Sequence, residues 1–411
     1  MRILLVTQLF PPEPQRVLTE LTTGLRDQGH EVTVLTGFPN FPSGKLYPGY
    51  RIRWIQRETL DGISVIRVPL IPDHSQSALR RSLNILSFAF FAALLGPFVV
   101  PKIDVVHVLH PPATSAIPGW LISRLRGVRF TYEIQDMWPE SLKATGMLRN
   151  ERALRLIGWF STWIYRRADA IRVITDGFRA NLIDKGVPAE KIHVISNWVD
   201  TQWYRPCARD EDLACEYGLN GRFNIMFAGV MGPAQALQVV IDAAALLRDL
   251  SDVQFVLVGG GNDVDALRKL AAERHLDNIL FLGQHPPDIM PRFFAVADVL
   301  FLHLKKDPLF KITIPHKTFA YMASAKPVLA AIEGDVAAVV ERAGAGLTCP
   351  SGDPVALAAT VRRLHGMTTA ERSRMGARGR AAACRLFSRD ACISQLGRMI
   401  EGAVRHSVPV T

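Results

Sequence analysis

The chain has 411 residues, a formal net charge of +10, and 48% hydrophobic against 21% charged residues. This length favours about two domains, each with its own core, and the composition excludes a disordered chain and an integral membrane bundle. The five cysteines form no CxxC pair and no Cys/His cluster with zinc spacing, so they are expected to be reduced thiols.

The positive charge is compatible with three kinds of partner: nucleic acid, an anionic membrane face, or a polyanionic small substrate. Lys and Arg are scattered along the whole chain without a zinc finger or an RNP-like motif, so no nucleic-acid partner is expected. The N-terminal apolar run is far shorter than a signal-peptide core and is followed by prolines. It is interpreted as a first strand, and the protein is expected to stay in the cytoplasm.

Strand and helix patterns alternate through the first half of the chain. Strands are predicted over 2–7, 31–35, 63–69, 105–109, 129–134, 170–174 and 192–195, and helices over 17–28, 114–126, 153–167 and 176–185. The tract 37–50 (GFPNFPSGKLYPGY) is rich in Gly, Pro and aromatic residues. Long loops inside compact domains are often functional, so this tract is interpreted as an ordered loop rather than a linker.

Residues 82–101 (SLNILSFAFFAALLGPFVVP) are almost long enough and apolar enough to span a bilayer. However, Asn84, Ser87 and Gly96-Pro97 interrupt the run, and a single span would separate the next strand from the first two. The favoured interpretation is a core helix or one that dips partly into a membrane surface, and a true span is the alternative. Peripheral association with the inner face of the cytoplasmic membrane is therefore expected.

A second alternating series follows a polar, irregular stretch over 207–222, which is the expected interdomain segment. Strands are predicted over 224–228, 254–259, 279–282, 299–304 and 328–332, and helices over 236–247, 263–274 and 316–324. Two such series predict an α/β fold with two facing, doubly wound Rossmann-like domains and a cleft between them. The expected domains are 1–200 and 201–385, with a C-terminal helix of about 386–411 packing back on the first domain.

The segment 309–330 (LFKITIPHKTFAYMASAKPVLA) joins two strands of the second series through a basic turn and a helix. This order places Lys311, Lys317 and first-turn helix amides at the carboxyl end of a parallel sheet, where anionic ligands are commonly held. A phosphate-bearing ligand is the favoured interpretation. An ordinary strand-helix-strand unit with solvated lysines is the alternative.

Nine segments, in order over nearly the full length, resemble bacterial glycosyltransferase family 4, of GT-B architecture, and especially its exopolysaccharide and O-antigen branch. They are QLFPPEP, GHEVTVLTGFPNFPSGKLYPGY, YEIQDMWPESL, ISNWVDTQWYRP, FAGVMGPAQAL, LVGGGND, NILFLGQ, IPHKTFAYMASAKPVLA and AGAGLTCPSGDPVALA. The resemblance implies a second domain that binds a nucleotide-diphospho-sugar, a first domain that binds the acceptor, and transfer with retention at the anomeric carbon.

Transfer from such a donor leaves negative charge on the diphosphate, so the site needs cations and oriented amides. With the resemblance, this gives the donor-binding candidates Arg16, Gly229, Gln235, Gly260, Gly261, Gly283, Gln284, Lys311, Lys317 and Thr318. Fixed lysines and helix N-termini can replace a metal, so no metal or other cofactor is expected. The one DxD string, Asp263-Val264-Asp265, starts a helix and is interpreted as capping and solvated charge.

Three residues at strand ends of the first domain are the catalytic candidates. Asp136 and Glu140 could orient or deprotonate the acceptor hydroxyl, and the alternative is a loop capped by carboxylates. His110 could touch the donor sugar or cover the diphosphate, and the alternative is turn chemistry before two prolines.

Several positions depart from the family pattern. A Glu that would hold the nucleotide ribose is commonly found where this chain has Ala320, and Ile312 stands at the position of its partner. Val230 and Gln235 replace the usual Arg and Lys of the donor loop, and Ala236 replaces Gly. In the first domain, Gln15-Arg16 occupies a site that is often glycine-rich near the diphosphate, and one interpretation is that Arg16 is an added phosphate cation. These changes imply altered donor contacts or reduced activity.

The sequence thus predicts a retaining, metal-independent glycosyltransferase of surface polysaccharide synthesis. Its donor would be UDP-linked, with an N-acetylated amino sugar as one option, and its acceptor a lipid-linked saccharide. A UDP-GlcNAc 2-epimerase and a catalytically silent sugar-nucleotide-binding subunit are the alternatives.

Overall fold

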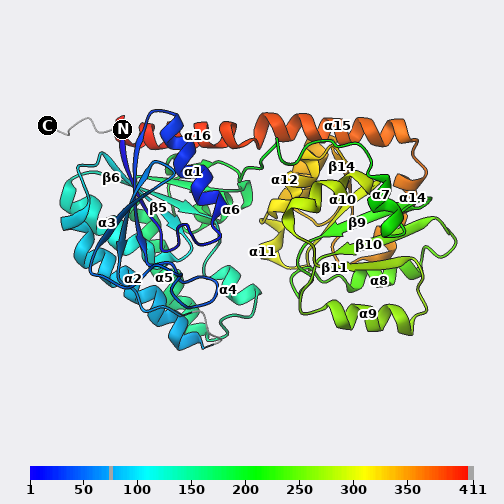
Figure 1. Ribbon diagram of the computed structural model, residues 1–411, viewed down its shortest axis with the longest axis horizontal. Helices are drawn as coiled ribbons and strands as arrows, with labels where there is room; N and C mark the ends of the chain where they lie inside the picture. The colour runs from blue at the N-terminus through cyan, green and yellow to red at the C-terminus, as the bar shows by residue number, and fades with distance from the viewer. Residues whose placement is uncertain (74–76, 406–411) are drawn as a thin grey trace. The chain divides into compact units, whose positions relative to one another are not determined.

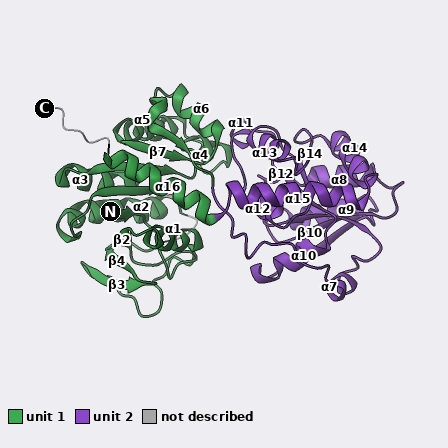
Figure 2. Cartoon of the chain, turned by 90° about the horizontal axis from the view of Figure 1, so that it is seen from above, with its two compact units in different colours: residues 1–196, 389–411 green, residues 197–388 purple. Residues whose placement is uncertain are grey.

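The computed structural model describes residues 1–73 and 77–405. The chain forms two compact units: unit 1 contains Met1–Ser196 and the chain from Arg389 onward, and unit 2 contains Asn197–Ser388 (Figure 2). The expected interdomain stretch at 207–222 is wrong, because it lies inside unit 2 and contains helix α7 (Glu211–Glu216). Its polar residues include Asp210, whose side chain caps that helix by accepting from the Leu213 amide at 3.0 Å.

Unit 1 is built on an eight-stranded sheet in the order β3-β4-β2-β1-β5-β6-β7-β8 (Figure 1). All neighbours pair in parallel except β3 and β4. The strands are β1 (Arg2–Val6), β2 (Glu31–Gly37), β3 (Gln56–Leu60), β4 (Ile63–Val68), β5 (Val105–His110), β6 (Arg129–Ile134), β7 (Ala170–Val173) and β8 (Ile192–Val194). The predicted Rossmann-like arrangement is confirmed for this unit.

Strand β3 is absent from the sequence prediction. Its residues, QRETL, contain one apolar side chain and are half-buried or exposed. It pairs antiparallel at the sheet edge, where a polar strand needs no apolar run to be stable.

Helices cover both faces of this sheet, with α1 and α16 on one side and α2, α3 and α5 on the other (Figure 1). The helices are α1 (Arg16–Asp27), α2 (Ala78–Val99), α3 (Ala116–Arg126), α4 (Glu140–Ala144), α5 (Glu151–Arg167), α6 (Asp176–Asp184) and α16 (Arg389–Arg405), with short 3₁₀ turns at Ala113–Ser115 and Ala189–Lys191. The last residues of the predicted C-terminal helix, 406–411, lie outside the described residues.

Helix α2 is a part of the unit 1 core along one of its faces. Phe88 and Ala92 are fully buried, and a Cβ at Gly96 would lie 2.7 Å from the Ile122 side chain. The buried Asn84 accepts from Gln8 at 2.5 Å and donates to the Ile71 carbonyl at 2.7 Å. By length and composition this helix could cross a bilayer. Part of it is buried against unit 1 and the rest is exposed.

Unit 2 is built on a fully parallel six-stranded sheet in the order β11-β10-β9-β12-β13-β14. The strands are β9 (Phe223–Ala228), β10 (Val253–Val258), β11 (Ile279–Gly283), β12 (Val299–His303), β13 (Val328–Ala331) and β14 (Gly346–Thr348). Besides α7, the helices are α8 (Gln238–Ala245), α9 (Val264–Glu273), α10 (Met290–Val296), α11 (Pro308–Lys311), α12 (His316–Ala323), α13 (Asp335–Ala343), α14 (Pro354–His365) and α15 (Thr369–Leu386), with a 3₁₀ turn at Pro287–Ile289. This unit is also Rossmann-like, as predicted.

A buried polar cluster joins three central strands of unit 1 on the face that α16 covers. The His107, Glu133 and Arg172 side chains are fully buried. Glu133 accepts from His107 at 3.2 Å and pairs with Arg172 at 2.7 Å. Arg172 also donates to the carbonyls of Ile195 and Ser196, where the chain leaves the unit. Burial opposes the charge of Glu133, but Arg172 and His107 outweigh it and hold the pKa at about 2.

Glu133→Gln is expected to destabilise unit 1 by about 3 to 5 kcal/mol, because it leaves the Arg172 guanidinium buried without a counter-charge. The pKa of Glu133 lies below its ordinary value of 4.5. The stabilisation is therefore complete above about pH 4.5 and is lost as the pH falls toward 2. Calorimetric unfolding across this pH range measures both effects. The exposed Glu190→Gln is the control, and equal stability of the two variants would contradict the assignment.

Candidate active site

The carboxyl ends of β9, β10 and β11 carry glycines whose backbones touch. The Gly259 amide donates to the Gly283 carbonyl at 2.7 Å, and Met231 donates to Gly260 at 2.8 Å. A Cβ at Gly259 would lie 2.0 Å from the Gly229 carbonyl oxygen, and one at Gly261 would lie 2.1 Å from that of Met231. Gly229, Gly259 and Gly261 all have positive φ. Only glycine permits this packing, which leaves a backbone-lined edge that a ligand can approach closely.

Lys317, on the first turn of α12, lies against this edge. Its ammonium is 2.6 Å from the position of a Cβ at Gly229 and 3.9 Å from the centre of the Phe227 ring. Within residues 1–73 and 77–405 it has no carboxylate partner and no hydrogen-bond acceptor. Burial lowers its pKa to about 8. Lys317 is half-buried, and a partly desolvated cation without a counter-charge is costly, so this position favours an anionic ligand.

The rest of α12 fixes this helix to the sheet. The Tyr321 hydroxyl accepts from the Ala228 amide at 2.9 Å and donates to its carbonyl at 3.2 Å. Thr318 is fully buried, and its hydroxyl has no partner in the described part of the chain. Ala320 is also buried, so the position where the family commonly has Glu offers only a methyl group.

The donor loop, residues 229–235 after β9, is held in place by hydrogen bonds of polar groups. The Gln235 side chain accepts from the Gly232 amide at 3.2 Å, and the backbone carbonyl of Gln235 accepts from His303 Nδ1 at 2.6 Å. Gln235 therefore shapes the loop in this structure. Ala236 has a φ of +44°, a left-handed conformation that explains why glycine is usual at this position.

Two other predicted donor residues lie at the margin of this edge. Lys311 is half-exposed and pairs with Glu333 at 3.3 Å, so its charge is already balanced. Gln284 is exposed, and its side-chain oxygen lies 3.4 Å from the position of a Cβ at Gly260.

In unit 1, His110 ends β5 beneath an aromatic cluster. It is buried, its Nδ1 has no hydrogen-bond partner among the described residues, and its ring lies edge-on to Trp138 with centres 5.0 Å apart. Burial lowers its pKa to about 3, so the imidazole is neutral at physiological pH.

Asp136 and Glu140 lie close together after β6. Burial raises the pKa of Asp136, and the charge of Glu140 adds to the shift. Glu140 pairs with Lys185 at 2.5 Å through one oxygen, whereas the other oxygen is buried without a partner in the described structure. Burial and these two carboxylates also raise the pKa of Tyr165. The structure thus brings two carboxyl groups to one strand end, and burial raises the pKa of one of them, Asp136.

Arg16 begins α1 and pairs with Glu20 at 2.6 Å on an exposed helix surface. The sequence analysis missed Glu13, three residues earlier. Its buried carboxylate accepts from the amides of Phe10, Asn40 and Phe41 at 2.8 to 2.9 Å. Glu13 therefore links the first loop to the 37–50 tract through hydrogen bonds. In the sequence, only its position between two prolines indicated a structural role.

The described residues contain no cluster of His, Cys, Asp or Glu that could hold a metal ion. Asp263 occupies the N-cap position of α9, but the predicted capping is wrong because its side chain makes no capping hydrogen bond. Its amide instead donates to the Met231 carbonyl at 3.1 Å, in the donor loop.

Family models match both units of the chain. A glycosyl transferase 4-like domain matches residues 14–198, and a glycosyl transferases group 1 domain matches residues 222–366. The chain therefore belongs to glycosyltransferase family 4, with the GT-B fold, as the sequence motifs predicted.

Three curated relatives are bacterial proteins whose names describe glycosyl transfer. A probable glycosyltransferase, WbjE of Pseudomonas aeruginosa, is 27% identical over 62% of this chain and 64% of its own length. A putative colanic acid biosynthesis glycosyl transferase, WcaI of Escherichia coli K12, is 28% identical over 68% and 70%. The GDP-mannose-dependent alpha-mannosyltransferase of Mycolicibacterium smegmatis is 28% identical over 92% and 91%. The match to the first of these thus spans slightly under two thirds of that protein.

Solved structures show the same fold at low sequence identity. HepE of Anabaena in complex with UDP has a TM-score of 0.73 and 18% identity, covering 98% of this chain and all of its own. WaaG, a glycosyltransferase involved in lipopolysaccharide biosynthesis, has a TM-score of 0.66 and 15% identity, covering 98% of this chain and all of its own.

Lys317→Met is expected to raise the free energy of unfolding by about 1 to 3 kcal/mol at pH 7, because it removes an unpaired, half-buried charge at similar volume. The folded-state pKa of Lys317 lies below its ordinary value of 10.5, so the cost of this charge is full below pH 8. The advantage of the variant should disappear as the pH rises from 8 to 10.5. Urea unfolding of unit 2 at several pH values measures it. Lys311→Met, at a half-exposed pair, should change little, and a less stable Lys317→Met would reveal an internal partner.

Proposed function

We propose that the protein is a retaining glycosyltransferase that moves a sugar from a nucleotide-diphospho-sugar to a lipid-linked saccharide in surface polysaccharide synthesis. The observation that carries the proposal is Lys317, a half-buried lysine without a counter-charge beside the strand-end Gly229. A diphosphate supplies the missing negative charge. UDP is the favoured nucleotide because HepE, of the same fold, was solved with UDP.

Each part of the unit 2 edge has a role in the transfer. As the glycosyl-phosphate bond breaks, the sugar gains oxocarbenium character and the leaving diphosphate gains charge. The Lys317 ammonium and the amides around Gly229 and Gly260 stabilise that charge in a poorly hydrated position. This is the work that a metal ion does in other transferases, so the reaction is proposed to need none.

The unit 1 residues act on the acceptor. Asp136, whose pKa is raised by burial, is placed as the group that orients the acceptor hydroxyl and takes its proton. Glu140 is held beside Asp136 by its ion pair with Lys185. His110 is neutral, so it can hydrogen-bond a sugar hydroxyl without repelling or attracting charge.

The acceptor and the location are inferred from the relatives and from α2. WcaI is named as a putative glycosyl transferase of colanic acid biosynthesis, and WaaG as a glycosyltransferase involved in lipopolysaccharide biosynthesis. The donor sugar is left open between a hexose and an N-acetylated amino sugar, because the relatives include both mannosyl and N-acetylglucosaminyl enzymes. The long apolar helix α2 supports peripheral attachment at the cytoplasmic face of the inner membrane.

A second candidate rests on Ala320. With a buried methyl group where a ribose-binding Glu is common, the chain would bind a sugar nucleotide without turning it over. Loss of that hydrogen bond costs about 1 to 3 kcal/mol unless another group replaces it.

Nucleotide release from a panel of UDP- and GDP-sugars, with a membrane extract as acceptor source, tests the proposal. One donor should turn over, and Lys317→Met should lower kcat/KM by about 100- to 1000-fold. Lys311→Met is the matched control and should cost less. Donor binding without turnover would favour the silent subunit, and rearrangement of the sugar without acceptor would reveal an epimerase. Anomeric configuration in the NMR spectrum of the product tests retention.

Asp136→Asn is expected to lower kcat by about 100- to 10,000-fold if the carboxylate takes the acceptor proton. The base form is lost as the pH falls through a pKa that is raised above its ordinary value of 3.8. The acid limb of the kcat profile should therefore lie above that value in the wild type and disappear in the variant. If the acid limb of the kcat profile is unchanged in Asp136→Asn, another group causes it. Glu140→Gln is the control for the neighbouring carboxylate.

A further inference from the structure

The solvent-facing side of α2 carries large apolar side chains from its first turn to its last. Phe98 is 83% exposed, Leu79 is 71% exposed and Phe90 is 61% exposed. The exposed apolar residues recur every three or four positions and form one row, the α2 stripe: Leu79, Leu83, Leu86, Phe90, Leu94 and Phe98. The helix has 22 residues and is about 33 Å long. Isolated exposed apolar residues need no explanation, but a continuous row marks an interaction surface.

The opposite face of α2 keeps this helix attached to unit 1. Phe88 and Ala92 are fully buried, and Asn84 is hydrogen-bonded to Gln8 beside β1. A helix that left the sheet to cross a bilayer would expose this apolar core and break these polar contacts. The α2 stripe therefore lies on a surface rather than in a span.

Two segments, one that packs against α2 and one that contains it, carry basic residues but no acidic ones. Residues 49–57 and 74–103 contain no Asp or Glu. Trp54 is 68% exposed and packs edge-on against Phe91 of α2, with ring centres 6.1 Å apart. The cations of these two segments are Arg51, Arg53, Arg57, Arg80, Arg81 and Lys102. An apolar row with a tryptophan and flanking cations matches an anionic bilayer surface.

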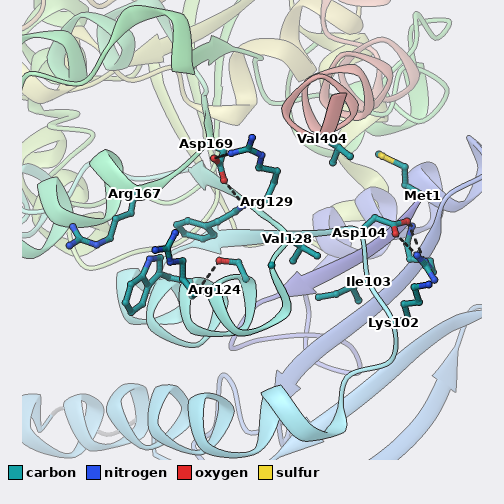
Figure 3. Close-up of a pocket in the computed structure, with 15 residues that line it drawn as sticks. Met1, Lys102, Ile103, Asp104, Arg124, Val128, Arg129, Arg167, Asp169 and Val404 are labelled. Atoms are coloured by element: carbon teal, nitrogen blue, oxygen red, sulfur yellow. Dashed lines mark hydrogen bonds and ion pairs between the residues drawn. The ribbon is translucent and has the colours of Figure 1, made fainter. Parts of the chain in front are cut away.

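A basic cavity of about 1090 Å³ lies at the amino end of the unit 1 sheet (Figure 3). Its carboxylates are already paired, Asp104 with Arg2 and Asp169 with Arg129. Lys102 and Arg124 also line it, and neither makes an ion pair with any described residue. The carboxylates of the cavity therefore do not balance its positive charge.

This cavity adjoins the end of the α2 stripe. Arg126, at the end of α3, donates to the carbonyls of Pro97 and Val100 at 2.8 and 3.0 Å. This contact fixes the α3 end beside Phe98, with the 63% exposed Leu125 next to it. The same corner of unit 1 thus presents apolar side chains and a cationic cavity.

We propose that unit 1 docks on an anionic phospholipid bilayer, with α2 in the interfacial plane and a headgroup phosphate in this cavity. The inference deepens the proposed function and rests on it for its purpose, since a lipid-linked acceptor is met at the bilayer. The bound phospholipid is a docking partner and not the acceptor. A second copy of the chain fits less well, because an isologous contact would bring the same cations together.

Vesicle flotation tests the proposal, with phosphatidylcholine alone and with phosphatidylcholine mixed with phosphatidylglycerol. The wild type should bind the mixed vesicles at least tenfold more tightly. The stripe variant, Leu94→Glu with Phe98→Glu, should lose at least tenfold on both. The cavity variant, Lys102→Glu with Arg124→Glu, should lose the preference for phosphatidylglycerol. Val355→Glu with Arg363→Glu, at exposed positions of α14 in unit 2, is the matched control and should bind as the wild type does.

Three outcomes would overturn the proposal. Wild-type affinity of the stripe variant for both kinds of vesicle would show that the α2 stripe is not needed for binding. Conversion of a wild-type dimer into a monomer by the stripe variant would assign the row to a second copy. If Arg51→Glu with Arg53→Glu loses the preference for phosphatidylglycerol and the cavity variant keeps it, the headgroup does not bind in the cavity. Nucleotide release without vesicles is measured separately, so failure of the transferase and failure of the docking surface are distinguishable.

Discussion

The candidate ligand-binding edge of unit 2 depends on one uncompensated charge, the half-buried side chain of Lys317. Three strand-end glycines bring the backbones of neighbouring loops into contact, which makes the edge narrow enough to bury part of this side chain. Tyr321 then bonds both backbone groups of Ala228, so α12 cannot move the lysine away from β9. The fold thereby maintains an electrostatic imbalance that is costly for the free protein and favourable only when an anion is present.

In contrast to Lys317, the buried charges of Glu133 and Arg67 in unit 1 have counter-charges. In unit 1, Glu133 is bonded by His107 and Arg172, and Arg67 pairs with Glu58 at 2.5 Å while donating to the Gly37 carbonyl. These clusters satisfy their members and join strands to loops. The contrast separates charges that hold the architecture from a charge that awaits a ligand, and it does so without reference to the identity of any relative.

The alternation of apolar runs and helix patterns was enough to predict the central strands of both sheets, because parallel strands buried on two faces leave a strong signal in a sequence. It also placed Lys317 at a strand end. It missed the edge strand β14, which has three half-buried residues. The polar edge strand β3, the three-amide role of Glu13 and the absence of a capping bond at Asp263 could not be predicted, since each depends on contacts between distant segments. The polarity of residues 207–222 resembled that of a linker, although they pack as a helix and turns within unit 2.

The assignment of α16 to unit 1 has a consequence for biosynthesis. This helix buries Ile393, Leu396 and Ile400, and a Cβ at Gly24 would lie 2.6 Å from Ile393. The ribosome delivers these residues only after all of unit 2 has been made. The first unit to be synthesised is therefore the last to be completed, and its uncovered sheet face must remain protected while the second unit folds. A stop codon near the end of the reading frame would damage the N-terminal unit first.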